Sequence, residues 1–217
     1  MTYEEALGAT GRQVWSGLCE ERKVEVLQAL EDRAARESGR LSRPVVAEWL
    51  HTGQDGVVLG TFNPSQQTIS VNASQLGEGA SCGEDSSRMV ETIFHEGRHA
   101  YQHDVVEGRI PHADAEEARA WAENLEPGGY VRFWENPRAY FAQPVEADAR
   151  RFAEARSARL EQERSELLMQ EESNKRDSNE ASEDRLERAR RAFEGRAAPE
   201  PRVAEKRQRA AHVVRMA

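Results

Sequence analysis

The spacing of hydrophobic residues changes along the chain from helical to strand-like and back. Residues 3–38 place apolar side chains three or four positions apart, which predicts two amphipathic helices. Residues 44–74 turn to short runs rich in β-branched and aromatic side chains, which predicts a small sheet. We expect its strands at 44–50, 57–62 and 68–72. The polar residues 63–67 predict a hairpin turn between the last two strands.

Helical spacing returns in two later segments. Residues 75–88 are rich in glycine, serine and acidic side chains and predict a loop, from which Ser86 or Ser87 caps the next helix. That helix, 86–104, has one apolar stripe. The stripe consists of Met89, Val90, Ile93, Phe94, Gly97, Ala100 and Tyr101. A proline in the first turn and a second apolar stripe predict a further helix at 144–160.

The remaining residues are mostly charged and define the domain boundary. Residues 161–217 have few apolar side chains, which predicts a charged tail that is mostly helical or disordered. We therefore predict an α+β fold with one compact domain over residues 1–155. In that domain the small sheet packs against the helix at 86–104.

Charge and composition narrow the function classes. Residues 151–217 hold 16 basic and 14 acidic side chains, which leaves 14 basic and 25 acidic ones in residues 1–150. This acidic body argues against nucleic acid or an anionic membrane as a partner. No apolar run reaches transmembrane length, residues 1–5 do not resemble a signal peptide, and two cysteines suggest no disulfide framework. We expect a protein made in the bacterial cytoplasm, and export by a signal-independent apparatus stays open.

The candidate chemistry lies in residues 95–99, His-Glu-Gly-Arg-His. On a helix, His95 and His99 lie one turn apart on one face, so both imidazoles can bind a single zinc ion. Glu96 lies between them and can reach a water held by that metal. The alternative is an amphipathic helix with histidines at its polar edge.

A catalytic zinc site uses three protein ligands and keeps a fourth position for water. Glu146 is the best candidate for the third ligand, because a carboxylate beside an apolar stripe needs a partner. It follows His99 by 47 residues, which is enough for a second helix to return alongside the first.

These residues carry a family resemblance. His-Glu-x-x-His on one helix, followed by a glutamate on a later helix, resembles the gluzincin branch of the zincin metallopeptidases. Residues 146–153 are similar to the third-ligand helix of ImmA/IrrE-type metallopeptidases of bacteria and phages. Residues 94–102 are similar to compact zincins of phage proteins and polymorphic toxins. The resemblance covers roughly residues 55–155. Position 150 is arginine, not the aspartate of thermolysin-like enzymes, so the subfamily stays open.

The resemblance implies a zincin-like domain in which His95, His99 and Glu146 bind Zn²⁺ and Glu96 is the general base. It also implies that the edge strand of the small sheet binds an extended peptide, since strand pairing supplies backbone hydrogen bonds. The alternative is a plain structural hairpin. We accordingly predict a zinc metalloendopeptidase, a hydrolase that acts on a protein or peptide substrate. A bacterial effector or toxin and a phage-related protease both fit this resemblance.

Four more side chains are candidates for supporting roles. Tyr130 or Tyr140 could donate a hydrogen bond to a developing oxyanion, although large aromatic residues more often pack a core. Asp148 could orient a ligand histidine or could be a solvated carboxylate. His103 continues the spacing of the two ligand histidines, and we expect it beside the metal ligands or exposed.

A protein of another class is the alternative. In that case the zinc fold is an inactive scaffold, and the charged tail docks a partner such as an inhibitor or immunity protein. A metal site with an open coordination position favours the enzyme, whereas a fourth protein ligand favours the scaffold.

Overall fold

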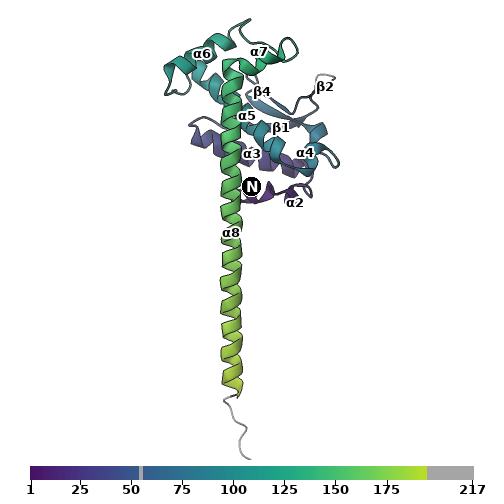
Figure 1. The fold of residues 1–217 in the computed structure, drawn as a ribbon, viewed down its shortest axis with the longest axis vertical. Helices are drawn as coiled ribbons and strands as arrows, with labels where there is room; N and C mark the ends of the chain where they lie inside the picture. The colour runs from purple at the N-terminus through teal and green to yellow at the C-terminus, as the bar shows by residue number, and fades with distance from the viewer. Residues whose placement is uncertain (54–55, 195–217) are drawn as a thin grey trace, which may run out of the picture. The chain divides into compact units, whose positions relative to one another are not determined.

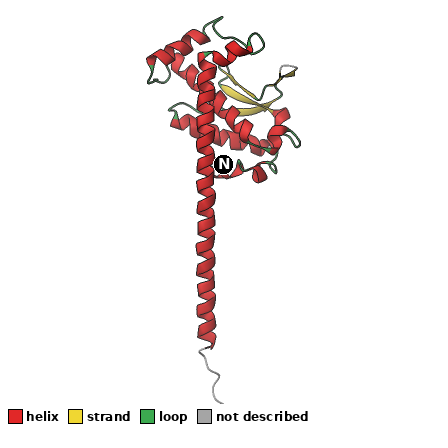
Figure 2. Cartoon of the chain, viewed as in Figure 1, coloured by secondary structure: helices red, strands yellow, loops and turns green. Residues whose placement is uncertain are grey.

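The computed structural model describes residues 1–53 and 56–194 and has an α+β fold, as predicted (Figure 1 and Figure 2). Its α-helices are α1 (Tyr3–Ala9), α2 (Arg12–Trp15), α3 (Glu20–Glu37), α4 (Ser81–Glu84), α5 (Ser87–Val106), α6 (Ala115–Leu125), α7 (Pro137–Ala142) and α8 (Pro144–Glu194). A short 3₁₀-helix, η1, covers Ala73–Gln75. The chain divides into two units, Met1–Met169 and Gln170–Ala217.

The sheet of the first unit has three strands in the order β1 (Val45–Glu48), β5 (Thr68–Asn72) and β4 (Gly60–Asn63). Strand β1 runs parallel to β5, and β4 runs antiparallel to it. The predicted hairpin turn between the last two strands is therefore confirmed. The strand predicted at 57–62 is divided in two, because its first residue belongs to a small hairpin. That hairpin consists of β2 (Thr52–Gly53) and β3 (Gly56–Val57).

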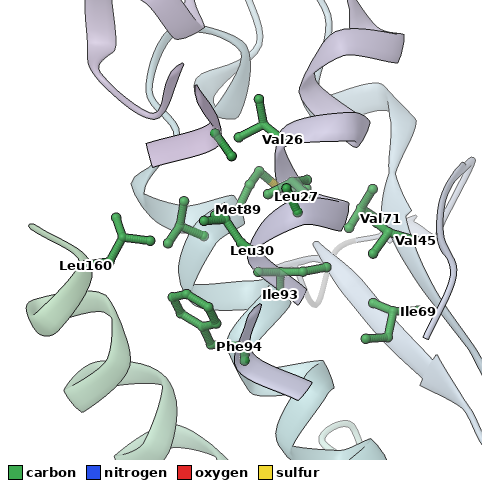
Figure 3. Close-up of a cluster of buried hydrophobic side chains, with 14 of the residues drawn as sticks. Val26, Leu27, Leu30, Val45, Ile69, Val71, Met89, Ile93, Phe94 and Leu160 are labelled. Atoms are coloured by element: carbon green, nitrogen blue, oxygen red, sulfur yellow. The ribbon is translucent and has the colours of Figure 1, made fainter. Parts of the chain in front are cut away.

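The core lies between α3, α5 and the sheet, and the first part of α8 closes one side (Figure 3). Fully or almost fully buried side chains come from each of these elements. They include Leu27, Leu30, Ile69, Val71, Met89, Ile93, Phe94 and Leu160. The predicted stripe of α5 thus faces the core, which leaves the neighbouring face of that helix for chemistry.

Two small residues bring α5 close to its neighbours. At Gly60 of β4, a Cβ atom would lie 2.5 Å from the Thr92 side chain of α5. At Gly97 of α5, a Cβ atom would lie 2.8 Å from both Arg40 Nη2 and Glu31 Oε2, which form a buried ion pair. The glycine inside the histidine motif therefore makes room for this ion pair, and Gly60 lets the edge strand approach the motif helix.

Several local predictions need correction. Residues 75–88 contain η1 and α4 in addition to a loop. Ser86 is the N-cap residue of α5, but its side chain does not cap that helix. Its hydroxyl instead donates a hydrogen bond of 2.7 Å to the carbonyl of Thr10. The serine therefore ties the start of the motif helix to the N-terminal helices.

Helix α8 is longer than the predicted segment 144–160, since it continues to Glu194. The compact unit also extends to Met169, beyond the boundary predicted at residue 155. In the second unit, residues 170–194 are helical and residues 171–193 are all exposed. Residues 195–217, the rest of the predicted tail, lie outside the described part. Among the described helices, none is both long and apolar enough to cross a membrane.

Candidate metal centre

The three side chains that the sequence proposes as ligands converge between α5 and α8. His95 Nε2 lies 3.0 Å from His99 Nε2. Glu146 Oε2 lies 3.3 Å from His95 Nε2, and Glu146 Oε1 lies 3.4 Å from His99 Nε2. Within residues 1–53 and 56–194, these side chains form the one group of three or more His, Cys, Asp or Glu residues able to hold a metal ion together.

The spacing of the three donors fits a zinc ion. Zinc binds imidazole nitrogen at about 2.0–2.1 Å with tetrahedral geometry, which places neighbouring donor atoms about 3.3 Å apart. The observed separations are 3.0, 3.3 and 3.4 Å. Glu146 is only 1% exposed, and its Oε2 atom is buried without a hydrogen-bond partner among the described residues. A bound cation would satisfy this buried carboxylate oxygen.

The electrostatics of the cluster also favour a cation between these groups. Burial alone would raise the pKa of Glu146, but the imidazoles of His95 and His99 hold this pKa well below its ordinary value. Burial alone would lower the pKa of His99, but Glu146 and Glu96 raise it to about 9. A carboxylate that attracts a proton onto its neighbouring imidazole attracts a metal ion to the same place.

Glu96 occupies a separate position beside the ligands. Its side chain is 8% exposed, and Oε2 accepts a hydrogen bond of 2.8 Å from the backbone N–H of Phe62 in β4. It is not a member of the group of potential ligands. Strand β4 therefore orients this carboxylate next to His95, where it can exchange a proton with a molecule in the adjoining cleft.

That cleft has a volume of about 750 Å³. Its floor on α5 comprises Arg88, Glu91, Thr92, His95 and Glu96. One wall comprises His51 and residues 56–60, and the other comprises Phe133, Trp134 and Tyr140. Both walls are largely apolar, and the floor carries most of the polar and ionisable groups. Among the potential metal ligands, His95 borders this cavity, which a substrate could enter.

The two candidate tyrosines have different surroundings in the structure. The hydroxyl of Tyr130 donates a hydrogen bond of 2.6 Å to Glu146 Oε1. Tyr140 lines the cleft with Glu96, and its ring centroid lies 6.3 Å from that of Tyr130. Burial and the nearby carboxylate of Glu146 raise the pKa of both phenols above their ordinary value. Both hydroxyls are therefore neutral hydrogen-bond donors, one committed to a ligand and the other beside the cleft.

The other two candidates also differ. Asp148 lies beside the site but contacts neither ligand histidine directly in the hydrogen bonds of the described residues. It accepts hydrogen bonds from Arg98 and from Gln102. His103 lies against the ring of Phe62, with ring centroids 5.5 Å apart, and its Nδ1 is 3.7 Å from Glu107. His103 is therefore not one of the three converging donors.

The prediction from sequence missed Gln102. This residue is 1% exposed, and its Oε1 atom lies 2.9 Å from Nδ1 of His99. The signal was present, since Gln102 follows His99 by three positions, a spacing that brings side chains together on a helix. A polar residue next to the apolar stripe at this spacing indicates a partner for the second ring nitrogen of the ligand.

No protein-family model, curated protein or solved structure matches this chain.

Proposed function

We propose that this protein is a zinc-dependent metallopeptidase. The observation that carries the proposal is the convergence of His95, His99 and Glu146 within 3.0–3.4 Å of one another, with Glu96 beside them in a cleft. The spacing of these donors suits zinc, and the place of His95 and Glu96 at a cavity suits catalysis more than structural metal binding. From the resemblance in its sequence, we also propose that this protein belongs to the zincin metallopeptidases.

A zinc ion held by the three ligands would supply a Lewis acid that polarises a carbonyl group and acidifies water. The chain's own contribution to proton transfer comes from Glu96. Its carboxylate is positioned by the Phe62 N–H, so it can accept a proton from water in the cleft and return it to the leaving amine. Tyr140 has a neutral hydroxyl at the same cleft and can donate a hydrogen bond to the negative charge that develops on the carbonyl oxygen.

The edge strand supports a peptide as the substrate. The Leu59 carbonyl accepts a hydrogen bond from Asn72 of β5, so Gly60, the next residue, directs its backbone groups away from β5. Gly60 lines the cleft, and among the described strands β4 pairs only with β5. An extended peptide segment could therefore pair with the outer edge of β4 at Gly60, whereas the N–H of Phe62 on that edge already donates to Glu96. The apolar walls favour large apolar side chains, which an unfolded protein exposes.

The ligand count distinguishes this proposal from the inactive scaffold. Structural zinc sites have four protein ligands, whereas catalytic sites have three and an open position. In the described part of the chain, three such side chains form the group, and a fourth His, Cys, Asp or Glu does not join it. This favours the enzyme over the scaffold. We also propose action as a bacterial effector and docking of an inhibitor or other partner on the tail.

The proposal is tested with purified full-length protein and an unfolded protein substrate such as reduced casein. We expect about one zinc per chain by metal analysis, cleavage of the substrate, loss of cleavage after chelation and its return on addition of zinc. As a control, His95→Ala should neither hold zinc nor regain cleavage. Zinc binding without any cleavage of unfolded proteins would favour the scaffold, and a chain that binds no zinc would exclude both.

A further inference from the structure

The two ligand histidines are supported unequally. Each uses Nε2 to face the other ligands. Nδ1 of His99 contacts Gln102 Oε1 at 2.9 Å, while the described residues offer Nδ1 of His95 no hydrogen-bond partner. The second ring nitrogen of a ligand histidine is almost always hydrogen-bonded, and that bond fixes both the tautomer and the orientation of the ring. Only His99 has such a bond from a side chain in the described structure.

The hydrogen bonds of Gln102 determine which way its amide points. Its nitrogen lies 2.9 Å from the carbonyl oxygen of Val145 and 2.8 Å from Asp148 Oδ2. A backbone carbonyl can only accept a hydrogen bond, so the amide nitrogen must face Val145 and the amide oxygen must face His99. Nδ1 of His99 then carries the hydrogen, which leaves the lone pair of Nε2 directed at the other two ligands.

The same amide joins the two helices that supply the ligands. Gln102 and His99 are on α5, whereas Val145 and Asp148 are on α8 and flank Glu146. Asp148 is held in turn by Arg98, whose guanidinium donates to both of its carboxylate oxygens at 2.7 and 3.2 Å. The Arg98 guanidinium also packs on the rings of Tyr101, Trp121 and Phe152. Asp148, which accepts a hydrogen bond from the Gln102 amide, is therefore also held in place by Arg98.

From this geometry we infer that Gln102 is the positioning residue of the metal centre: its amide sets the tautomer of His99 and holds the helix of Glu146 in register with it. This inference rests on the metal site of the proposed function but does not depend on peptide hydrolysis. Its readout is accordingly the affinity of the full chain for zinc, measured by competition with a chelator. Loss of an outer partner of this kind typically lowers metal affinity about 10–100-fold.

Gln143 provides a matched control. It is also a buried glutamine next to the start of α8, and it also uses both ends of its amide. Its partners are Asn124 and the backbone of Val131, which are not ligands. We expect Gln102→Met to lower zinc affinity about 10–100-fold and Gln143→Met to change it less than about threefold. An equal loss of zinc affinity in both variants would show that the effect is general destabilisation. Unchanged zinc affinity in Gln102→Met would contradict the positioning role of Gln102.

A second pair of variants does not require an apolar residue at this site. Gln102→Glu keeps an acceptor for His99 but places a carboxylate against the carboxylate of Asp148, so we expect weaker zinc binding. Adding Asp148→Asn restores the total charge and provides an amide nitrogen that donates to the new carboxylate. We expect the double variant to regain at least about tenfold in affinity. A double variant that binds zinc no better than Gln102→Glu would contradict the inference.

The outcomes also separate this inference from the proposed function. If the unaltered chain binds no zinc, the metal site fails and both proposals fall together. If it binds zinc and the Gln102 variants bind equally well, only the positioning role is lost. If the Gln102 variants bind weakly as expected but the unaltered chain cleaves no protein, the positioning role stands and the peptidase does not.

Discussion

Helix α8 has one secondary structure but two different environments. In residues 144–169 it buries Val145, Glu146, Ala149, Ala153 and Leu160, and it contributes one of the three candidate ligands. In residues 171–193 every residue is exposed. The second region instead has pairs of opposite charges four positions apart. These pairs are Glu172–Arg176, Asp184–Arg188 and Glu187–Arg191.

The contrast shows that a continuous helix can be stabilised by different interactions along its length. The first region is held by burial of an apolar stripe, which is a tertiary interaction. Exposed pairs four residues apart contribute only about 0.3–0.5 kcal/mol each, so the second region depends mainly on local helix propensity. We therefore expect substitutions to have large effects on metal binding and stability in the first region and small effects in the second.

The largest difference should appear for two glutamates of α8. Glu146→Ala removes a candidate ligand, so we expect zinc affinity to fall more than about 100-fold, beyond the loss typical of an outer partner. Glu172→Ala, at a side chain that is 69% exposed, should leave zinc affinity unchanged. Competition with a chelator measures both. Full zinc binding by Glu146→Ala would move the third ligand to another residue.

A smaller difference is expected for two leucines. Leu160 is 1% exposed and packs in the core, whereas Leu186 is 71% exposed. Leu160→Ala should lower the free energy of unfolding by about 2–5 kcal/mol, because it removes buried methyl groups and leaves a cavity. Leu186→Ala should change it by less than about 0.5 kcal/mol. Urea unfolding of the two variants measures the difference, and equal losses would show that the second region is also buried in solution.

The smallest effect should come from removing the second unit altogether. A chain that ends at Met169 keeps the three candidate ligands, Glu96 and both walls of the cleft. We expect its zinc affinity and its cleavage rate on an unfolded protein to remain within about twofold of the full chain, since the described residues 171–193 that are removed are all exposed. A truncated chain that folds and binds zinc but no longer cleaves would assign the second unit a part in catalysis.

Sequence patterns predicted the features that depend on neighbouring positions. The motif helix, the hairpin between β4 and β5, and the helix start at Pro144 follow from local spacing and turn chemistry. The helical spacing of His95 and His99 also places both side chains on one face of α5. Short-range rules are sufficient for these features because each residue's partner lies within four positions or in the next strand.

Contacts between distant segments were harder to predict from the sequence. The bond from Tyr130 to Glu146 and the bonds from Gln102 to Val145 and Asp148 depend on how α5, α8 and the intervening segment cross. No spacing rule within one helix determines that crossing. The length of α8 was also underestimated, because the polar composition after residue 170 fits an exposed helix and a disordered chain equally well.

The most direct test of the proposed chemistry is Glu96→Gln in the full chain. Glutamine keeps the shape of the side chain but cannot accept a proton, and general-base catalysis typically contributes about 10²–10⁴-fold to a rate. Zinc content, thermal unfolding and cleavage of an unfolded protein are measured for the variant and the unaltered chain. We predict unchanged zinc and stability with cleavage reduced at least about 100-fold. A variant that holds zinc and cleaves at the original rate would contradict the role of Glu96 and, with it, the peptidase proposal.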